Sequence, residues 1–286
     1  MPNKLTDQQL SQAIEAMMIE QNLRGMQNLY AHQQIGTYLR AAEALHQANN
    51  TVLIGTGFAV KQTFETDGPV GAIALYNTLK KLGKKPILVC GNPLYSALKN
   101  DFNCFELPLD NFNDAMAFSK QALAKLNPDC VLSIERPGLC HGNKYYNMRG
   151  IDISADCGCF DFFITQASCP TIAIGDGGNE IGMGNVAQHM TELNIMPSLT
   201  CCDELLLADV SNWAAYGIIA FLSRWHRQDL LANVDTLAIL HYLSERGSVD
   251  GVTHKNELTE DGLNAIHGQQ LITRLRQLDG FIENED

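Results

Sequence analysis

The stretches Thr51-Val-Leu-Ile-Gly55 and Pro86-Ile-Leu-Val-Cys90 decide the fold, because a helical segment lies between them. Both stretches are continuously apolar rather than alternating, which is typical of parallel strands that are buried on both faces. The segment between them, residues 69–82, begins with a proline, which is favoured at the first helical position, and ends before Gly83. Strand, helix and strand in this order predict a parallel βαβ unit.

The same alternation continues after this unit. Strand candidates and helical patterns follow one another, without a Pro/Ser-rich linker, a repeat or a low-complexity tract. This predicts an α/β fold, with a mostly parallel sheet of about six strands and helices on both faces. Further strands are expected at residues 104–107, 129–134, 170–174 and 204–208, and further helices at residues 113–126 and 212–224.

Helical patterns occupy both ends of the chain. The lead-in, residues 1–49, opens with a capping box formed by Thr6 and Gln9. The C-terminal region, residues 233–286, has the pattern of a helix, a polar loop and a second helix. We therefore predict a single domain, residues 1–286, with helical additions at both termini. The helices of these additions are expected from about Gln27 to Ala48, from Val234 to Glu245 and from Leu263 to Leu278.

The composition excludes several classes of partner. The 286 residues include 32 acidic and 20 basic ones, which gives a formal net charge of -12. Nucleic acids and anionic membranes are therefore not expected partners, because both are bound through Lys and Arg. The first 30 residues contain no apolar stretch of signal-peptide length after a basic start, and no run of about 18 apolar residues could span a bilayer. The nine cysteines form no pair of CxxC knuckles, so we expect free thiols in a reducing, cytoplasmic location rather than structural zinc.

Ligands of open parallel sheets bind beyond the carboxyl ends of the strands, so the loops after the strands are the places to search. After the first strand, Gly55-Thr56-Gly57-Phe58 lacks the third glycine of a dinucleotide-binding turn. The second strand is not followed by an acidic residue that would hold a ribose, and we expect no nucleotide cofactor. Asp67 is either a site residue or an acidic neighbour of the helix that begins at Pro69.

The fourth strand runs into Glu135 and Arg136, and the loop that follows carries Asn147 and Arg149. This loop has about fifteen residues, which is longer than a connection normally needs, and long ordered loops tend to be functional. Guanidinium groups bind a carboxylate or a phosphate through two parallel hydrogen bonds. The pattern favours anion recognition here, and a solvated pair of Glu135 and Arg136 is the alternative.

The fifth strand is followed by the run Gly175-Asp176-Gly177-Gly178-Asn179-Glu180-Ile181-Gly182-Met183-Gly184-Asn185. Its glycines indicate backbone conformations or contacts that a Cβ atom would forbid. Asp176, Asn179 and Glu180 concentrate oxygen ligands there, which suits Mg²⁺ or Mn²⁺. A flexible polar loop is the alternative. After the sixth strand, Asn212 begins a helix and is a candidate substrate contact.

The motifs that stand out are, in chain order, Thr66-Asp67-Gly68-Pro69, Glu135-Arg136-Pro137-Gly138, Tyr146-Asn147-Met148-Arg149-Gly150, residues 175–185, Ser211-Asn212-Trp213 and Asp250-Gly251. In this order they resemble the D-glutamate cyclase family, specifically its carboxyl-terminal domain, over nearly the whole chain. The resemblance implies an α/β domain with an acidic, metal-associated pocket. It also implies a carbon–oxygen lyase (hydro-lyase) activity that converts D-glutamate to 5-oxo-D-proline and water.

These inferences give a hypothesis for the roles of the candidate residues. Glu135, Asp176 and Glu180 are the candidate catalytic residues, with Glu135 as the general base. Clustered carboxylates are costly without a cation, which favours a divalent ion, Mn²⁺ or Mg²⁺, that polarises the γ-carboxyl group. The candidate metal ligands are Asp67, Asp176 and Glu180, and the candidate contacts to a small acidic amino-acid substrate are Arg136, Asn147, Arg149, Asn179 and Asn212.

Two alternatives use the same residues. The first is a divalent-metal-dependent hydrolase, such as a small-molecule phosphatase, because an acidic cluster and an arginine pair also suit phosphate transfer. The second is a catalytically silent module that binds a metabolite. The sequence leaves the oligomeric state open, and a homo-oligomer is compatible with it.

Overall fold

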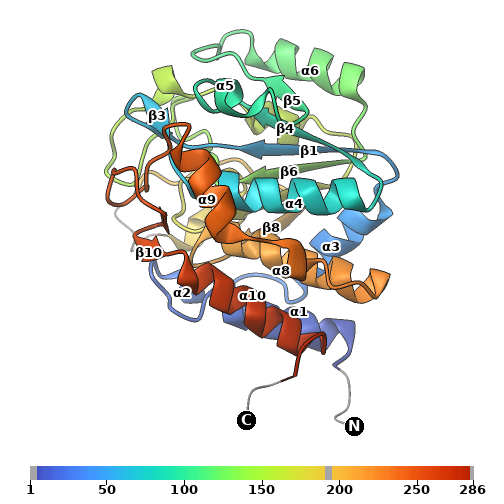
Figure 1. The fold of residues 1–286 in the computed structure, drawn as a ribbon. Helices are drawn as coiled ribbons and strands as arrows, with labels where there is room; N and C mark the ends of the chain where they lie inside the picture. Colours follow the sequence, from blue (N-terminus) through green and yellow to red (C-terminus); the bar gives the residue numbers. More distant parts are fainter. Residues whose placement is uncertain (1–4, 191–194, 284–286) are drawn as a thin grey trace.

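The computed structural model describes residues 5–190 and 195–283. Its centre is a six-stranded sheet in the order β5-β4-β1-β6-β7-β8, and all neighbouring strands are parallel (Figure 1). The predicted α/β class and the parallel sheet are therefore confirmed. The strands are β1 (Thr51–Thr56), β4 (Lys85–Cys90), β5 (Cys104–Glu106), β6 (Cys130–Ile134), β7 (Thr171–Gly175) and β8 (Glu204–Leu207).

Both faces of the sheet are buried, which explains why its strands are continuously apolar. Successive side chains of a strand point to opposite faces, so Val52 and Ile54 pack into one core and Leu53 into the other. The helices over the first core are α1 (Asp7–Met18), α3 (Thr37–Gln47), α4 (Pro69–Lys81), α5 (Leu94–Leu98), α8 (Ser211–His226), α9 (Thr236–Ser244) and α10 (Ile266–Leu278). Those over the second core are α2 (Met26–Tyr30), α6 (Ala115–Leu126) and α7 (Asp161–Thr165).

The chain order of the strands reverses between β1 and β6. From β1 the chain builds β4 and then β5 on one side, and it returns through α6 to place β6 on the other side of β1. In open parallel sheets, loops diverge at such a reversal and leave a crevice beyond the carboxyl ends of the two strands. The loops after β1 and β6 therefore border the place where a ligand is expected to bind.

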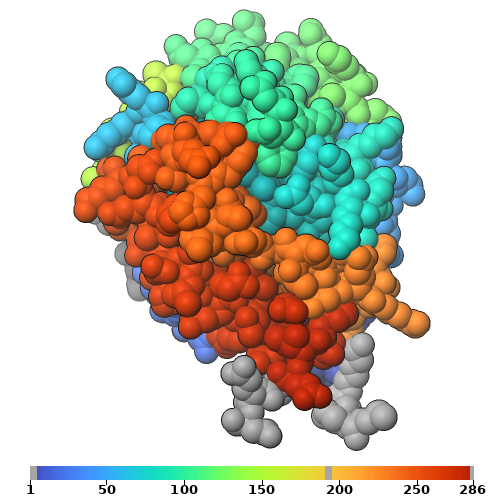
Figure 2. All heavy atoms as spheres, viewed as in Figure 1, coloured from blue at the N-terminus to red at the C-terminus, as the bar shows by residue number. Residues whose placement is uncertain are grey.

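The terminal additions pack around α8. Helices α1 and α10 both contact α8 and lie at the lower edge of the view in Figure 1. In Figure 2 the C-terminal part of the chain, coloured orange to red, covers much of the face shown. The short elements are the hairpin strands β2 (Ala59–Val60), β3 (Thr63–Phe64), β9 (Thr259–Glu260) and β10 (Leu263–Asn264), and the 3-10 helices at Ser154–Asp156, Met183–Asn185, Ala187–His189 and Leu231–Asn233.

The prediction of one helix from Gln27 to Ala48 is wrong, because the chain forms α2 and α3 with a turn between them. The second helix begins after Gly36, whose φ of +91° is left-handed and cannot continue an α-helix. The Gly36 amide donates a hydrogen bond of 2.8 Å to the buried carboxylate of Glu15. The helix expected from Leu263 likewise begins only at Ile266, because the residues before it form β10.

Two further features bear on the composition. Within the described ranges, no helix combines the length and the apolarity that crossing a membrane requires. All nine cysteines carry free thiols, and Cys201 is the only exposed one.

Candidate active site

A cavity of about 440 Å³ lies beyond the carboxyl ends of β6 and β7, a size that suits a small-molecule ligand. Glu135, directly after β6, lines this cavity, together with Asp176, Asn179 and Glu180 from the glycine run after β7. All four side chains are buried. The cavity therefore combines residues that the sequence placed in two separate loops.

Asp67, Glu135 and Asp176 form the centre of the site. Each offers a carboxylate oxygen, and these three oxygens lie within 4.8 Å of one another. Glu135 adopts a φ of +45°, an unfavourable backbone conformation for a residue with a side chain. Gly68 allows the loop of Asp67 to approach, because a Cβ atom there would lie 2.8 Å from Cβ of Glu135.

The amino-terminal end of α8 holds two of these carboxylates. Asp67 accepts hydrogen bonds from the backbone amides of Ser211 (2.9 Å) and Asn212 (2.8 Å), and from that of Gly68 (2.9 Å). The Ser211 hydroxyl donates to Oε2 of Glu135 over 2.6 Å. The free amides and the dipole of a helix amino terminus favour negative charge, so α8 stabilises the acidic centre.

The glycine run shapes the other side of the centre. The amides of Gly177 and Gly178 donate to the two carboxylate oxygens of Glu180, over 2.9 and 2.7 Å. A Cβ atom on Gly177 would lie only 2.7 Å from Oε1 of Glu180, so the close approach requires glycine. Among the described residues, Oδ2 of Asp176 and Oδ1 of Asn179 are buried without a hydrogen-bond partner. Buried polar atoms of this kind are costly, and here they are free to bind a ligand in the cavity.

Arg24 is a site residue that the sequence reasoning missed. It lies between α1 and α2, and its Nη1 is 2.6 Å from Oδ1 of Asp176 and 2.6 Å from Oδ2 of Asp261. The negative charge of Asp176 is the main cause that raises the pKa of the Arg24 guanidinium further above its usual value. Arg24 thus joins the N-terminal lead-in to the C-terminal hairpin across the acidic centre.

Burial raises the pKa of every carboxyl group around this centre. The pKa of Asp67 and of Asp261 is raised to about 7, first by burial and then by the charge of a neighbouring aspartate. The pKa values of Glu135 and Asp176 lie well above their usual values, again mainly through burial. Glu65, Glu180 and Glu260 are shifted in the same direction for the same reason.

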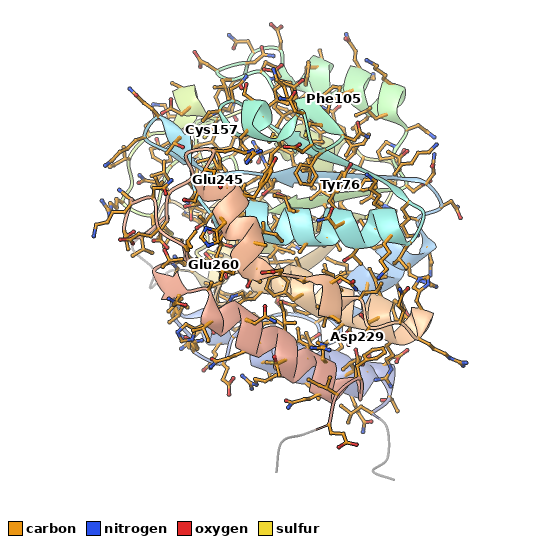
Figure 3. The ribbon with its side chains drawn as sticks, viewed as in Figure 1. Tyr76, Phe105, Cys157, Asp229, Glu245 and Glu260 are labelled. Atoms are coloured by element: carbon orange, nitrogen blue, oxygen red, sulfur yellow. The ribbon has the colours of Figure 1, made fainter. Side chains whose placement is uncertain are left out.

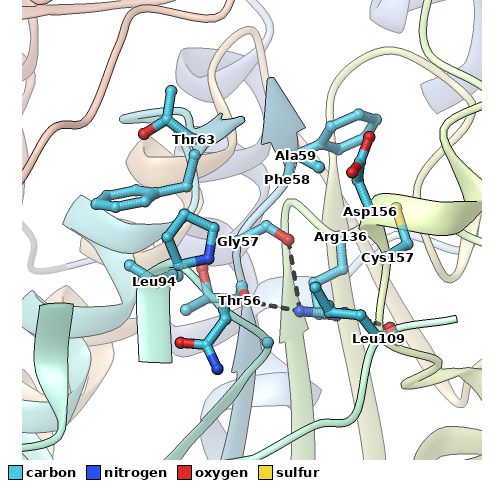
Figure 4. A pocket seen from close by; sticks show the side chains of 15 residues that line it. Thr56, Gly57, Phe58, Ala59, Thr63, Leu94, Leu109, Arg136, Asp156 and Cys157 are labelled. Atoms are coloured by element: carbon cyan, nitrogen blue, oxygen red, sulfur yellow. Dashed lines mark hydrogen bonds between the residues drawn. The ribbon is translucent and has the colours of Figure 1, made fainter. Parts of the chain in front are cut away.

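Arg136 lies in a different environment from the one expected of a substrate contact. Its Nη1 donates to the carbonyl oxygen of Thr56 over 2.7 Å, and its Nη2 donates to that of Gly158 over 2.6 Å. Figure 4 shows its guanidinium beside Thr56 and Gly57, in a smaller pocket of about 30 Å³. These bonds tie the loop after β6 to the loop after β1, which is a positioning role.

The other predicted substrate contacts also divide into residues that line the cavity and residues that do not. Asn147 and Arg149 line the main cavity, and Oδ1 of Asn147 accepts the Arg149 amide over 2.9 Å within its own loop. Asn212 does not line the cavity: its Oδ1 accepts the Gly71 amide (2.7 Å), and its Nδ2 donates to Glu260 (2.8 Å). Glu260, labelled in Figure 3, belongs to the C-terminal hairpin strand β9. Asn212 therefore joins α8 to α4 and to this hairpin.

The donor set fits a hard divalent cation. Asp67, Glu135 and Asp176 supply buried carboxylate oxygens, and the unpartnered Oδ2 of Asp176 remains available. Within the described part of the chain, Glu180 is not in this group of three, and its oxygens accept the Gly177 and Gly178 amides. By distance, the group of possible metal ligands therefore contains Glu135 in place of Glu180. The role of Glu180 as a metal ligand stays a prediction.

A family model described as "D-glutamate cyclase-like, C-terminal" matches residues 14–276. The chain belongs to this family. The match includes all the strand-end loops that meet at the acidic centre, and it confirms the resemblance seen in the motifs. It also includes Arg24 and Asp261, which no strand-end argument had selected.

Among characterised relatives of this D-glutamate cyclase-like chain is the human mitochondrial D-glutamate cyclase, which is 28% identical over 237 residues. The match covers 73% of this chain but only 38% of the human protein, so the chain matches well under half of that relative. Solved structures with some similarity include an exopolyphosphatase-related protein from Bacteroides fragilis (TM-score 0.42, 9% identity, 87% of this chain and 62% of that one). A glycosyltransferase from Rickettsia africae has a TM-score of 0.31 at 15% identity, over 55% of this chain and 42% of that one.

Arg24 and Glu65 escaped the sequence reasoning because neither of them directly follows a strand of the main sheet. Arg24 lies in the N-terminal addition, which was treated as a helical lead-in. A signal for Arg24 does exist: Asn22-Leu23-Arg24-Gly25 interrupts the helical pattern of the lead-in with a glycine at φ +78°. A basic residue in such a break merits attention in a chain with few basic residues.

Proposed function

We propose that the cavity converts D-glutamate to 5-oxo-D-proline and water, with a bound Mn²⁺ or Mg²⁺. The observation that carries this proposal is the buried group of Asp67, Glu135 and Asp176, with an unpartnered oxygen of Asp176 beside a cavity of small-molecule size. Membership of the D-glutamate cyclase-like family supports the choice of reaction.

The reaction needs a base near the substrate amine. Cyclisation requires the ammonium group of glutamate to lose a proton before its nitrogen attacks the γ-carboxyl carbon. Glu135 suits this role, because burial and the nearby charge of Asp176 raise its pKa toward the range of an effective base. The Ser211 hydroxyl holds one of its oxygens, which orients the other for proton transfer.

Atoms balance without any further reactant. The ammonium group carries three hydrogens and the product amide retains one, so two hydrogens leave with the departing oxygen as water. Glu135 takes these two protons from nitrogen one after the other, before and after the nitrogen–carbon bond forms, and returns each to the departing oxygen. When bound, a divalent ion held by Asp67 and Asp176 would supply Lewis-acid polarisation of the γ-carboxyl group, which leaves Glu135 free as the base. The unpartnered Oδ1 of Asn179 can accept a hydrogen bond from the substrate amine.

The direct test is an incubation of the purified chain and Mn²⁺ with D-glutamate, L-glutamate and a small phosphoester, each in a separate reaction. We expect D-glutamate to be lost as 5-oxoproline appears, measured by chiral chromatography. Release of phosphate without 5-oxoproline would instead favour the hydrolase. If nothing turns over but D-glutamate raises the melting temperature, the silent binding module replaces the proposal.

The metal assignment has its own test. We expect Asp176→Asn to lower the Mn²⁺ content of the purified protein, because it removes a buried anionic ligand. Glu180→Gln tests whether Glu180 is also a ligand. Asp110→Asn, an exposed aspartate outside the cavity, is the matched control and should retain its metal. Unchanged metal content in both Asp176→Asn and Glu180→Gln, measured by elemental analysis, would contradict the assignment of the metal ligands.

A further inference from the structure

Arg24 has one side of its guanidinium group engaged and the other side open. Both of its ion pairs, to Asp176 and to Asp261, are made by Nη1. Within residues 5–190 and 195–283, its Nε and Nη2 make no hydrogen bond. The side chain is 22% exposed and lines the 440 Å³ cavity. Two adjacent N–H donors of a guanidinium match the two oxygens of a carboxylate.

We propose that Arg24 is the residue that recognises a carboxylate of the ligand, through Nε and Nη2. This inference rests on the proposed function for the identity of the ligand, an amino acid whose α-carboxylate binds Arg24. It replaces Arg136 in that role, because the Arg136 guanidinium donates to backbone carbonyls. It also differs from the role predicted for Arg149, an exposed residue at the margin of the cavity.

The protein positions Arg24 from several directions. Asp209, which follows β8, is buried and accepts the amides of Gln21 (2.7 Å) and Leu23 (2.9 Å). These bonds hold the turn that carries Arg24. On the opposite side, Asp261 contacts the guanidinium directly. A cation held at both the backbone and the side chain loses little entropy when it binds a ligand.

The charges of the cavity favour such a cation, since Lys61 and Arg149, the other basic residues that line it, are exposed. Glu65, Glu135, Asp176, Glu180 and Asp261 all line it, and a surface of this sign repels an anionic ligand. A positive group at one end of the cavity gives a zwitterionic ligand a single favourable orientation. Its carboxylate lies against Arg24, and its ammonium group lies toward the carboxylates, where Glu135 is placed to accept a proton.

The experiment compares a carboxylate with its amide on two forms of the protein. The probes are 5-oxo-D-proline and 5-oxo-D-prolinamide, which differ only in the group proposed to bind Arg24. Isothermal titration calorimetry with Mn²⁺ present measures their affinities for the wild type and for Arg24→Gln. We expect the wild type to favour the acid by about 10-fold or more, and Arg24→Gln to lose this preference while retaining its affinity for the amide.

Two further variants separate recognition from folding. Arg24→Lys retains the charge but not the planar fork, so we expect an intermediate preference for the acid. Arg40→Gln breaks an ion pair with Glu204 (2.7 Å) away from the cavity and should keep the full preference. If Arg24→Gln does not fold, Arg24→Lys still reports on the proposal through the ratio of the two affinities.

Several results would overturn the inference. These are equal loss of affinity for the acid and the amide in the variants, no preference for the acid in the wild type, or no binding of the acid at all. The inference and the proposed function fail separately, because binding of 5-oxo-D-proline does not require turnover. A wild type that prefers the acid but never forms 5-oxoproline retains the Arg24 assignment and rejects the cyclase activity.

Discussion

Glu135 combines several features that are energetically unfavourable in the folded state. Its side chain is buried, it faces Asp176, and its backbone has a φ of +45°. Each of these disfavours the folded state, and such costs persist where the surrounding structure imposes them. The Ser211 hydrogen bond and the close contact of Gly68 hold the side chain in place. A residue held under this much strain is a strong candidate for chemistry.

Glu135→Gln should separate activity from stability. We expect kcat for 5-oxoproline formation to fall by at least about 100-fold, because the amide cannot accept the proton. The same change removes a buried charge, so the melting temperature at pH 8 should rise or stay unchanged. The matched control is Glu43→Gln, an exposed glutamate of α3, which should alter neither quantity. Retention of most of the activity by Glu135→Gln would exclude Glu135 as the base.

At the scale of elements, the turn before α2 determines where Arg24 lies. Asp209 bridges the amides of Gln21 and Leu23, and its own amide donates to the carbonyl of Met18 over 2.7 Å. The loop after β8 thus fixes the turn between α1 and α2. The turn is short, and this buried carboxylate holds it together with the side chains of Asn22 and Gln27.

Asp209→Ala should therefore affect both stability and recognition. We expect the free energy of unfolding to fall by about 3 kcal/mol, the order of two lost charge-assisted hydrogen bonds, measured by urea denaturation. The preference for 5-oxo-D-proline over its amide should fall as well. Asp129→Ala is a matched control, because Asp129 also bridges two amides, those of Asn50 and Thr51, at the other end of the sheet. It should lose stability but keep the preference, and the same loss of preference in both variants would argue against the positioning role of Asp209.

The elements differ in how far the sequence predicts them. The strands that Glu135 and Asp176 follow could be predicted, because a buried parallel strand is continuously apolar and polar residues mark its end. The break at Gly36 was missed, because the flanking apolar residues keep a helical spacing on both sides of the turn. The contact of Arg24 with Asp261 could not be predicted from spacing, since it depends on how the two terminal additions pack. Asn212 was predicted as a substrate contact, but in the structure it joins three elements and does not line the cavity.

At the scale of the whole molecule, part of the net charge of -12 is concentrated in one buried place. Among the described residues that line the cavity, Arg24 is the one partly buried basic residue that faces the carboxyl groups. Lys61 and Arg149 also line the cavity, but they are exposed at its margin. Their pKa values are raised, chiefly by burial, so the protein without a divalent ion holds protons there that the unfolded chain would release.

Stability should consequently depend on pH in a defined direction. The folded-state pKa values of Asp67, Glu260 and Asp261 are about 7, above the values of about 4 expected in an unfolded chain. The stability linked to these protons is complete below the unfolded pKa and is lost as the pH rises through 7. With EDTA present, we expect the melting temperature to fall by at least about 5 °C between pH 5.5 and pH 8.

Two additions to this experiment identify the cause. Asp261→Asn should flatten the decline, because its side chain no longer ionises. Mn²⁺ should raise the melting temperature more at pH 8 than at pH 5.5, since a cation binds the ionised groups. A melting temperature that rises with pH in EDTA would contradict the account of the buried carboxyl groups.

The bond between Arg24 and Asp261 joins residues 237 positions apart, so it closes a loop that contains most of the chain. Closing so large a loop is entropically costly, and contacts of high sequence separation form late in folding. Each strand-end loop can acquire its local shape before the two ends meet, but the cavity lacks a wall until then. In refolding from denaturant, helical circular dichroism should therefore recover before the capacity to bind a carboxylate. Ligand binding thus reports on the last stage of folding, and a misfolded or shortened chain with normal helix content would be detected by its failure to bind.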